Sequence, residues 1–268
     1  MTHSVSSGSI SPAFLPAPPL PACSTLALFL DVDGTLVDFA DRPEAVRVAP
    51  SLPPLLRTLR ERLGGALAAI SGRPLRDVDA LLGLGGPAAG LHGGEIRYAD
   101  GRVAAPPRGD ERRMAALYAQ AAAFAARWPG VVVETKPDAL ALHYRTAPAA
   151  AAAVREAADA LLREAGPGYA LQPGNHVVEL KPAGVDKGGA VAALMREAPF
   201  AGRTPWVLGD DLTDEHAFAR AAALGGAGVI VGPRRPTAAR YALAGTDAAR
   251  AWLAALAAPS PVARGRKA

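Results

Sequence analysis

LALFLDVDGTL, residues 26–36, is the stretch of sequence that decides the fold. Its first five residues form a short apolar run, which is typical of a parallel strand buried on both faces. Asp31 and Asp33 follow at once and precede Gly34. Ligands of open α/β sheets bind at the carboxyl ends of the strands, so this spacing puts one carboxylate where it can attack and another where it can shuttle protons. The alternative is an ordinary charged turn, since Asp-Gly pairs are common in turns.

Strand and helix patterns alternate on both sides of this stretch. The predicted helices cover residues 52–63, 75–82, 187–197, 214–222 and a final Ala-rich segment after Thr246. The predicted strands cover residues 26–30, 66–70, 88–91, 206–209 and 227–231, and an Asp-Gly hairpin is expected at 98–102. This alternation predicts an α/β protein with a doubly wound parallel sheet of the Rossmann-like kind, formed by residues 25–104 and 183–260.

Residues 105–182 have a different rhythm, in which a helix and two strands occur twice. The predicted helices are 110–127 and 148–164, the second capped by Thr146, and the predicted strands are 131–136, 139–144, 169–171 and 176–181. A hairpin turn is expected at Asn175 and His176. This pattern predicts a small α+β cap domain with an antiparallel sheet, inserted into the core. Residues 1–24 and 261–268 are expected to be a flexible leader and a flexible tail.

Composition restricts the classes of partner and the location. The net charge of +4 is small, and three of the positive charges fall in the tail, so no nucleic-acid surface is indicated. No run reaches the roughly 20 apolar residues that a membrane-spanning helix needs. Cys23 is the single cysteine, which excludes an internal disulfide and favours a reducing, cytoplasmic location. The alternative for the leader is a degenerate lipoprotein signal ending at Cys23.

A second acidic cluster follows the apolar run at 206–209. Asp210, Asp211, Asp214 and Glu215 lie within six residues and would repel one another unless a cation or a helix N-terminus offsets them. Hard oxygen ligands near a phosphate point to Mg²⁺. The alternative, in which the acids cap the following helix, applies best to Asp214 and Glu215.

Two further segments are suited to phosphate binding. Ser71-Gly72-Arg73 ends the second predicted strand, where a hydroxyl and a backbone N–H can hold a phosphate oxygen, although Ser-Gly is also an ordinary turn. Lys187 opens a predicted helix. The chain uses only four lysines among its 29 basic residues, and three of them, Lys136, Lys181 and Lys187, lie in or beside candidate site segments. A compact ammonium is therefore favoured at these places.

The order DVDGTL, ISGR, lysine and GDD resembles the haloacid-dehalogenase (HAD) superfamily across nearly the whole chain. The resemblance implies that Asp31 is a nucleophile that forms an aspartyl-phosphate and that Asp33 is the general acid and base. Ser71 and Lys187 then correspond to the groups that clamp the phosphate. The implied Mg²⁺ ligands are the Asp31 carboxylate, the Asp33 backbone carbonyl and Asp210, with Asp211 or Asp214 in support.

The inserted segment is similar to the cap of the trehalose-6-phosphate phosphatase family. The similarity rests on Glu134-x-Lys136, HYR at 143–145, VELKPAGVDKG at 178–188 and GDDLTDE at 209–215. It implies that Glu134, Lys136 and Glu179 hold the glucose hydroxyls, whereas spacing alone also allows a solvated sheet face with cross-strand pairs. Gly34, Arg73 and His92 are further expected around the substrate, although His92 can equally be a satisfied turn residue.

The expected function is therefore Mg²⁺-dependent hydrolysis of trehalose 6-phosphate through an aspartyl-phosphate. One alternative is a HAD phosphatase for another sugar phosphate, of the sucrose or mannosylglycerate type. A second is an inactive sugar-phosphate sensor, which the presence of both Asp31 and Asp33 disfavours. The expected partner is a small-molecule sugar phosphate for a monomeric enzyme, and association with a trehalose-phosphate synthase is left open.

Overall fold

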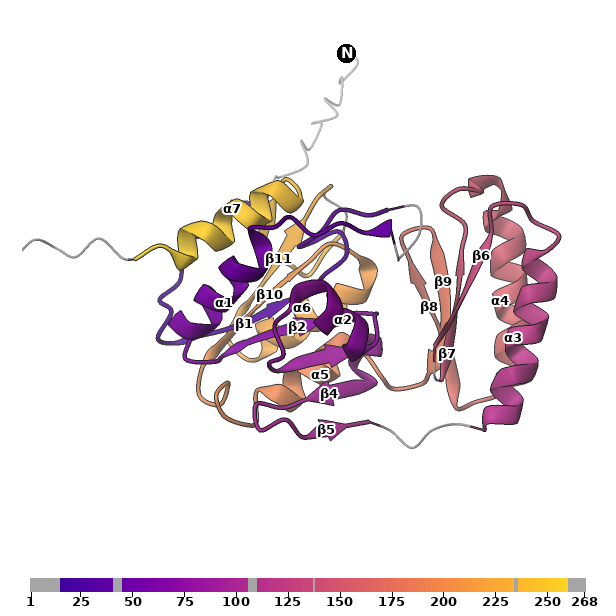
Figure 1. Ribbon diagram of the computed structural model, residues 1–268, viewed down its shortest axis with the longest axis horizontal. Helices are drawn as coiled ribbons and strands as arrows, with labels where there is room; N and C mark the ends of the chain where they lie inside the picture. Colours follow the sequence, from indigo (N-terminus) through magenta and orange to yellow (C-terminus); the bar gives the residue numbers. More distant parts are fainter. Residues whose placement is uncertain (1–14, 41–44, 106–109, 137, 234–235, 260–268) are drawn as a thin grey trace, which may run out of the picture.

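The computed structural model describes residues 15–40, 45–105, 110–136, 138–233 and 236–259. Within these residues, two sheets lie next to each other along the long axis of the molecule (Figure 1). The larger has eight strands and the smaller has four. This arrangement confirms the predicted α/β class, with a mainly parallel sheet and a smaller α+β unit inserted into it.

The larger sheet places the ends of β1 and β10 together at its centre. Its order is β12 (Tyr241–Leu243), β11 (Ala227–Val231), β10 (Thr204–Gly209), β1 (Leu26–Leu30), β2 (Leu67–Ile70), β3 (Ala88–Gly90), β4 (Glu95–Arg97) and β5 (Val103–Ala104). The strands from β12 to β3 are parallel, whereas β4 and β5 add an antiparallel edge. Leu30 pairs with Leu208, so the acids that follow the two strands emerge side by side.

Helices flank this sheet and bury its apolar strands. They are α1 (Leu52–Arg62), α2 (Leu75–Leu82), α5 (Lys187–Leu194), α6 (Glu215–Ala223) and α7 (Thr246–Ala257), with short 3₁₀ turns η2 (Leu91–Gly93) and η4 (Leu212–Asp214). All five residues of β1 are buried, and Phe29 stacks on Phe200 with ring centroids 5.2 Å apart. The continuous apolar strands predicted from the sequence are therefore the centre of the core.

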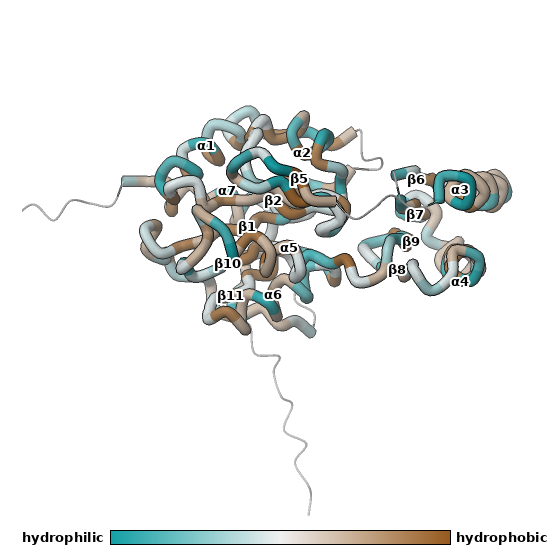
Figure 2. The backbone as a smooth tube through the Cα atoms, turned by 90° about the horizontal axis from the view of Figure 1, so that it is seen from below, coloured by the Kyte–Doolittle hydropathy of each residue, from teal (hydrophilic) through white to brown (hydrophobic). Residues whose placement is uncertain are grey.

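The smaller sheet has one covered face and one polar face. Its antiparallel order is β6 (Val132–Lys136), β7 (Ala139–His143), β9 (Val177–Pro182) and β8 (Tyr169–Gly174). Helices α3 (Glu111–Ala125) and α4 (Ala151–Ala165) cover the face directed away from the larger sheet (Figures 1 and 2). Leu140, Leu142 and Leu180 pack under these helices. Because side chains alternate along a strand, residues 134, 136 and 179 point toward the larger sheet.

Several local predictions differ from the structure. Thr146 caps no helix, because the 3₁₀ turn η3 (Pro148–Ala150) precedes α4 and the N-cap positions of η3 and α4 are Ala147 and Ala150. The Thr146 hydroxyl instead donates to the Gly130 carbonyl at 2.8 Å. The helix expected at 187–197 ends at Leu194 and continues as turns. The short edge strand β12 was not predicted, because three residues are too few to show a period.

Part of the expected leader packs against the body of the protein. The Pro16 carbonyl accepts a hydrogen bond from the Ala242 amide at 3.0 Å, and the Pro18 carbonyl accepts one from Nε1 of Trp252 at 3.2 Å. Residues 15–24 therefore differ from the expectation of a flexible segment. Residues 1–14 and the tail at 260–268 lie outside the described residues. In the part of the chain that the structure describes, no helix has the length and apolar character needed to cross a membrane.

Candidate active site

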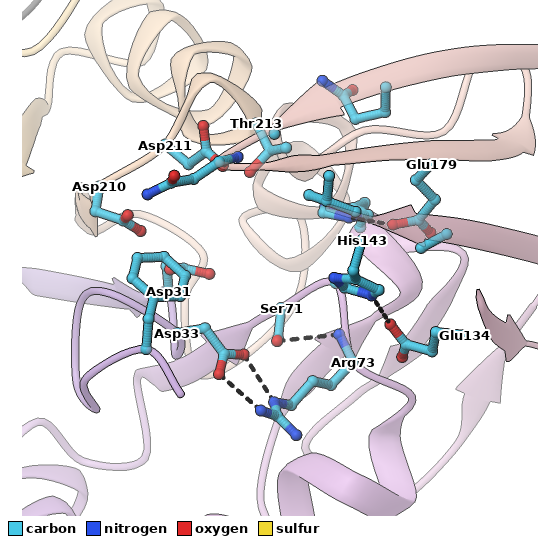
Figure 3. A pocket seen from close by; sticks show the side chains of 18 of the residues that line it. Asp31, Asp33, Ser71, Arg73, Glu134, His143, Glu179, Asp210, Asp211 and Thr213 are labelled. Carbon is cyan, nitrogen blue, oxygen red and sulfur yellow. Dashed lines mark hydrogen bonds and ion pairs between the residues drawn. The ribbon is translucent and has the colours of Figure 1, made fainter. Parts of the chain in front are cut away.

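A single pocket between the two sheets brings the predicted site residues together (Figure 3). The empty space within it is about 980 Å³, which includes space open to solvent. Its lining includes Asp31, Asp33, Ser71, Arg73, His92, Glu134, Lys136, Glu179, Lys187, Asp210 and Asp211. Acids that follow strands of the larger sheet thus face polar side chains from the smaller one.

Lys187 is the buried cation of the site. It is the first residue of α5, and its Nζ donates to Asp31 Oδ1 at 2.6 Å and to Asp214 Oδ1 at 2.8 Å. Burial by itself lowers the pKa of Lys187, but the two carboxylates outweigh it and raise the pKa above its usual value. Lys187 therefore stays charged throughout the physiological pH range.

The carboxylates around Lys187 repel one another. Oxygens of Asp31, Asp210 and Asp214 all lie within 4.8 Å of one another. Burial raises the pKa of Asp31 to about 7, although Lys187 opposes the shift. Burial, with the charges of Asp31 and Asp214, raises the pKa of Asp210 to about 9. One ammonium does not balance three carboxylates, so the geometry is suited to a further cation.

Asp214 orients this loop. Its Oδ2 accepts hydrogen bonds from the Asp210 and Asp211 amides, both at 3.1 Å, while its Oδ1 is bonded to Lys187. Both oxygens of Asp214 therefore have partners within the protein. In the described residues, no hydrogen bond reaches Asp31 Oδ2. The Asp210 carboxylate accepts only a long one of 3.5 Å from the Thr35 hydroxyl. Asp31 and Asp210 are thus the acids best placed to bind a cation directly.

Asp211 is placed differently from the expectation that it supports a metal. Its carboxylate accepts a hydrogen bond from the Asn175 amide at 2.9 Å and another from the Leu212 amide, which begins η4. Asn175 lies in the turn between β8 and β9, so Asp211 joins the smaller sheet to the larger one. The close group of acids contains Asp214 in its place. Adjacent acids in a sequence do not reveal which of them points inward.

Gly34 serves the site through its lack of a side chain. Its φ of +83° favours glycine, and an added Cβ would lie 2.4 Å from Asp210 Oδ2 and 2.6 Å from a ring atom of Phe39. Its amide donates to the Val37 carbonyl at 2.8 Å. Gly34 was expected to bind substrate, but it is absent from the pocket lining and instead allows Asp210 to approach the loop that follows β1.

Arg73 is bound to the predicted acid–base residue. Its Nε and Nη2 donate to the two oxygens of Asp33 at 2.7 and 2.8 Å (Figure 3). The Arg73 amide donates to the Ser71 hydroxyl oxygen at 3.1 Å, which leaves the hydroxyl hydrogen available to a ligand. Ser71 itself is buried at the end of β2. The segment 71–73 thus holds both the hydroxyl predicted to bind phosphate and the partner of Asp33.

The polar face of the smaller sheet carries a buried charged cluster. Lys136 Nζ donates to Glu179 Oε2 and to the Gly72 carbonyl, each at 3.0 Å, and lies 4.0 Å from Glu134. Glu134 accepts a hydrogen bond from Nε2 of His143 at 2.8 Å. Burial favours a higher pKa for Glu179, but Lys136 outweighs it and holds the pKa well below the usual value. These residues therefore form a hydrogen-bonded polar cluster that lines the pocket, and they are not an ordinary solvated sheet face.

His92 reaches the same cluster from the larger sheet. It lies in η2 directly after β3, and its Nε2 is 3.1 Å from Glu179 Oε2. Burial lowers its pKa although Glu179 favours the charged form, so the imidazole is neutral near pH 7. Its contact is thus with a charged residue of the facing sheet.

Two residues of the pocket, Phe39 and Arg145, were not predicted as site residues from the sequence. The Arg145 guanidinium lies 4.6 Å from the ring centroid of Phe39 and donates to the Asn175 carbonyl at 2.9 Å. Both Phe39 and Arg145 line the pocket. Phe39 follows the apolar residues Leu36 and Val37, so its local sequence carries no signal that distinguishes it as a pocket residue. Glu95, three residues after His92, accepts a hydrogen bond from the Leu75 amide at the start of α2.

The parallel sheet, the acids at the ends of β1 and β10, and the inserted antiparallel unit define the haloacid-dehalogenase class of hydrolase fold. The family model described as trehalose-phosphatase matches residues 29–247. The chain therefore belongs to the trehalose-phosphatase family.

Individual relatives agree with this assignment. The chain is 46% identical over 235 residues to a probable trehalose-phosphate phosphatase of Sinorhizobium fredii, which covers 86% of this chain and 87% of the relative. It is 42% identical over 230 residues to the trehalose-6-phosphate phosphatase of Escherichia coli, covering 85% of each chain. The C-terminal domain of trehalose-6-phosphate phosphatase from C. albicans has the same fold, with a TM-score of 0.81 at 22% identity, covering 92% of this chain and 99% of that one.

Proposed function

We propose that the protein hydrolyses trehalose 6-phosphate to trehalose and phosphate, in a Mg²⁺-dependent reaction through an aspartyl-phosphate. The observation that carries the proposal is that one pocket joins two chemistries. Asp31, Asp33 and Lys187 form a phosphate-transfer site at one end, and Lys136 and Glu179 form a hydroxyl-binding site at the other. The relatives named for this activity support the choice of sugar.

The donors present fit a magnesium ion. Asp31 and Asp210 would hold it with their carboxylates, together with the backbone carbonyl of Asp33, and Asp214 would orient the loop. All these donors are oxygens, and burial together with neighbouring carboxylates raises the pKa values of Asp31 and Asp210, a charge repulsion that a cation would offset. A bound Mg²⁺ would offset the negative charge of the phosphate dianion and favour the ionised carboxylates.

The protein's own groups account for both halves of the reaction. The Asp31 carboxylate attacks phosphorus, and the bond to the sugar oxygen breaks as Asp33 protonates that oxygen. Asp33 then removes a proton from the water that cleaves the aspartyl-phosphate and releases phosphate. The Ser71 hydroxyl and the Lys187 ammonium bind the non-bridging phosphate oxygens. Since both Asp33 oxygens accept from Arg73, this arginine has to release at least one of them when substrate binds.

The facing sheet supplies sugar recognition. Glu134 and Glu179 can accept hydrogen bonds from hydroxyls, and Lys136 can donate to them. Lys136 and Glu179 are buried, so a ligand that leaves them without hydroxyl partners is disfavoured. We further propose that residues 105–182 act as the cap over a core of residues 25–104 and 183–260. The separate apolar cluster beneath α3 and α4 supports this division.

The decisive experiment is phosphate release from trehalose 6-phosphate with Mg²⁺, repeated after chelation and with Asp31→Asn. We expect activity only with the metal and the intact carboxylate, and a preference over glucose 6-phosphate of about a hundredfold or more. Sucrose 6-phosphate and mannosylglycerate phosphate serve as comparison substrates. Equal hydrolysis of glucose 6-phosphate would contradict the sugar assignment, and activity in Asp31→Asn would contradict the aspartyl-phosphate.

We also propose a monomer that acts in the cytoplasm on a small sugar phosphate, without nucleic-acid or membrane partners. The small net charge and the free, half-buried Cys23 support these assignments. Association with a trehalose-phosphate synthase is tested by co-purification with such an enzyme.

A further inference from the structure

The sugar-binding side chains proposed above are bonded to one short segment of the larger sheet, and this inference rests on that proposed function. Lys136 Nζ donates to the Gly72 carbonyl at 3.0 Å, and Glu179 Oε2 lies 3.1 Å from Nε2 of His92. Gly72 stands between Ser71 and Arg73, which belong to the catalytic end of the pocket. The two ends of the pocket are therefore connected through Gly72 and His92.

The backbone around His92 is held in a demanding conformation. Leu91 and His92 both have left-handed backbones, with φ values of +50° and +55°. The His92 amide donates to the Ser71 carbonyl at 2.9 Å, and the Leu91 amide donates to the Arg73 carbonyl at 3.0 Å. A non-glycine residue in this region persists only when its surroundings determine it. Residues 71–73, the proposed phosphate-binding segment, and η2 are thus held together as one unit by these two backbone hydrogen bonds.

Gly72 provides the space for the imidazole. A Cβ added at Gly72 would lie 2.5 Å from Nε2 and 2.7 Å from Cε1 of His92. Real Cβ atoms essentially never come so close, and φ at Gly72 lies outside the left-handed region, so space is what requires glycine here. The ring consequently lies against the backbone of the phosphate-binding segment and reaches Glu179 from there.

The hydrogen-bonding capacity of His92 is directed at Glu179 and away from the sugar. A carboxylate only accepts, so the proton is on Nε2 and points at Glu179. Within the described residues, Nδ1 is buried and has no partner. A hydroxyl in the pocket therefore meets the carboxylate, while the imidazole lies behind it.

We propose that His92 is a positioning residue for substrate selectivity, which fixes Glu179 relative to the phosphate-binding segment while the Gly72 carbonyl fixes Lys136. This arrangement sets the distance between the site that holds the sugar hydroxyls and the site that holds the phosphate. Only a phosphate ester that fits both at once is then bound productively. A compact ester that ignores Glu179 gains little from the arrangement.

The test compares His92→Leu and His92→Gln, measuring kcat and KM for trehalose 6-phosphate and for p-nitrophenyl phosphate. Leucine keeps much of the volume and loses the donor, whereas the amide nitrogen of glutamine can replace Nε2. We expect the ratio of kcat/KM for the two substrates to fall roughly ten- to hundredfold in His92→Leu, because the bond to a buried carboxylate is lost. His92→Gln should recover most of the ratio. Gly72→Ala is the second variant and should lower the ratio by displacing the ring.

The outcomes separate this inference from the proposed function. A wild-type enzyme with no preference for trehalose 6-phosphate over p-nitrophenyl phosphate defeats the proposed function. A wild-type preference that survives in His92→Leu or in Gly72→Ala defeats the inference alone. Equal losses on both substrates, or equal losses in His92→Leu and His92→Gln, show a merely structural role and also overturn it. Thermal unfolding of each variant identifies any that fails to fold, and the remaining variant then decides.

Discussion

Asp210 illustrates at the residue scale how a site suited to a cation destabilises the fold that contains it. Its carboxyl is buried beside Asp31 and Asp214, which raises its pKa from the ordinary value of 3.8 to about 9. The folded, metal-free protein therefore holds a proton that the unfolded chain releases above pH 3.8. Stability consequently decreases as pH rises from about 4 toward 9, at up to about 1.4 kcal/mol per pH unit.

Replacing Asp210 with Asn should therefore stabilise the metal-free protein. We expect the unfolding temperature of Asp210→Asn to exceed that of wild type by at least about 2 °C at pH 8 without Mg²⁺, with the gap narrowing toward pH 5. Added Mg²⁺ should stabilise wild type and leave the variant unchanged, since one of its proposed ligands is gone. Differential scanning calorimetry with and without chelator measures both effects. A variant that is less stable at pH 8 would refute the charge-repulsion account.

Gly34 carries the second residue-scale prediction. Gly34→Ala combines a left-handed φ with a Cβ that meets Asp210, whereas Gly101→Ala has a φ of +85° and nothing within 4 Å. The control should cost about 1 kcal/mol in free energy of unfolding, from backbone strain alone. Gly34→Ala should cost at least about 2 kcal/mol and weaken Mg²⁺ binding as well. Urea unfolding and Mg²⁺ titration compare them, and equal losses would show that the approach of Asp210 is irrelevant.

At the scale of elements, the turn between β8 and β9 is attached to η4 by one side chain. Asp211 accepts from the Asn175 amide at 2.9 Å and begins η4 at the same time. Asp211→Asn keeps the shape and removes the charge. We expect KM for trehalose 6-phosphate to rise roughly three- to thirtyfold with little change in the Mg²⁺ requirement.

Asp210→Asn is the matched comparison, because it alters the neighbouring residue and should abolish the Mg²⁺ response. Steady-state kinetics at several Mg²⁺ concentrations separates the two effects. If Asp211→Asn raised the Mg²⁺ requirement as strongly as Asp210→Asn, Asp211 would be a ligand after all.

The sequence predicted elements well where the signal was local, and poorly where a partner far along the chain decided the outcome. β1, α2 and β11 coincide with their predicted bounds, because apolar runs and helical periods are local signals. Thr146 looked like a helix cap, yet its hydroxyl donates to Gly130 and the N-cap positions fall on Ala147 and Ala150. The choice between Asp211 and Asp214, and the direction of His92, depend on contacts across the two sheets. A linear pattern does not contain such contacts.

At the scale of the whole molecule, the stretch at 15–24 covers an edge of the larger sheet. Pro16 accepts from the Ala242 amide of β12, and Pro18 accepts from Trp252 of α7. Trp252 in turn stacks on Trp206 with ring centroids 6.0 Å apart. An edge strand with unpaired amides invites association with other chains, and this stretch protects it.

Shortening the chain to begin at Thr25 should therefore reduce stability and promote association. We expect the free energy of unfolding to fall by about 1–3 kcal/mol, because the hydrogen bonds of Pro16, Pro18 and Cys23 to the rest of the protein are lost, together with the packing of Leu15 and Cys23. Trp252→Phe is the milder comparison, since it removes mainly the bond to Pro18 and should cost about 1 kcal/mol. Urea titration and light scattering measure both variants. Unchanged stability in the shortened chain would mean that the stretch is dispensable.

The polar face of the four-stranded sheet, which α3 and α4 leave uncovered, has a consequence for how new enzymes of this kind can arise. The groups that we propose act on phosphorus all belong to the part of the protein built on the larger sheet, while nearly all that we propose recognise the alcohol lie on the smaller sheet, which has its own apolar cluster. Replacing the inserted α+β unit with another at the same two junctions should redirect the enzyme to a different phosphate ester without changes to the residues around Asp31. Such a replacement works only if the new unit also supplies a carboxylate that pairs with His92 and an ammonium that donates to the Gly72 carbonyl.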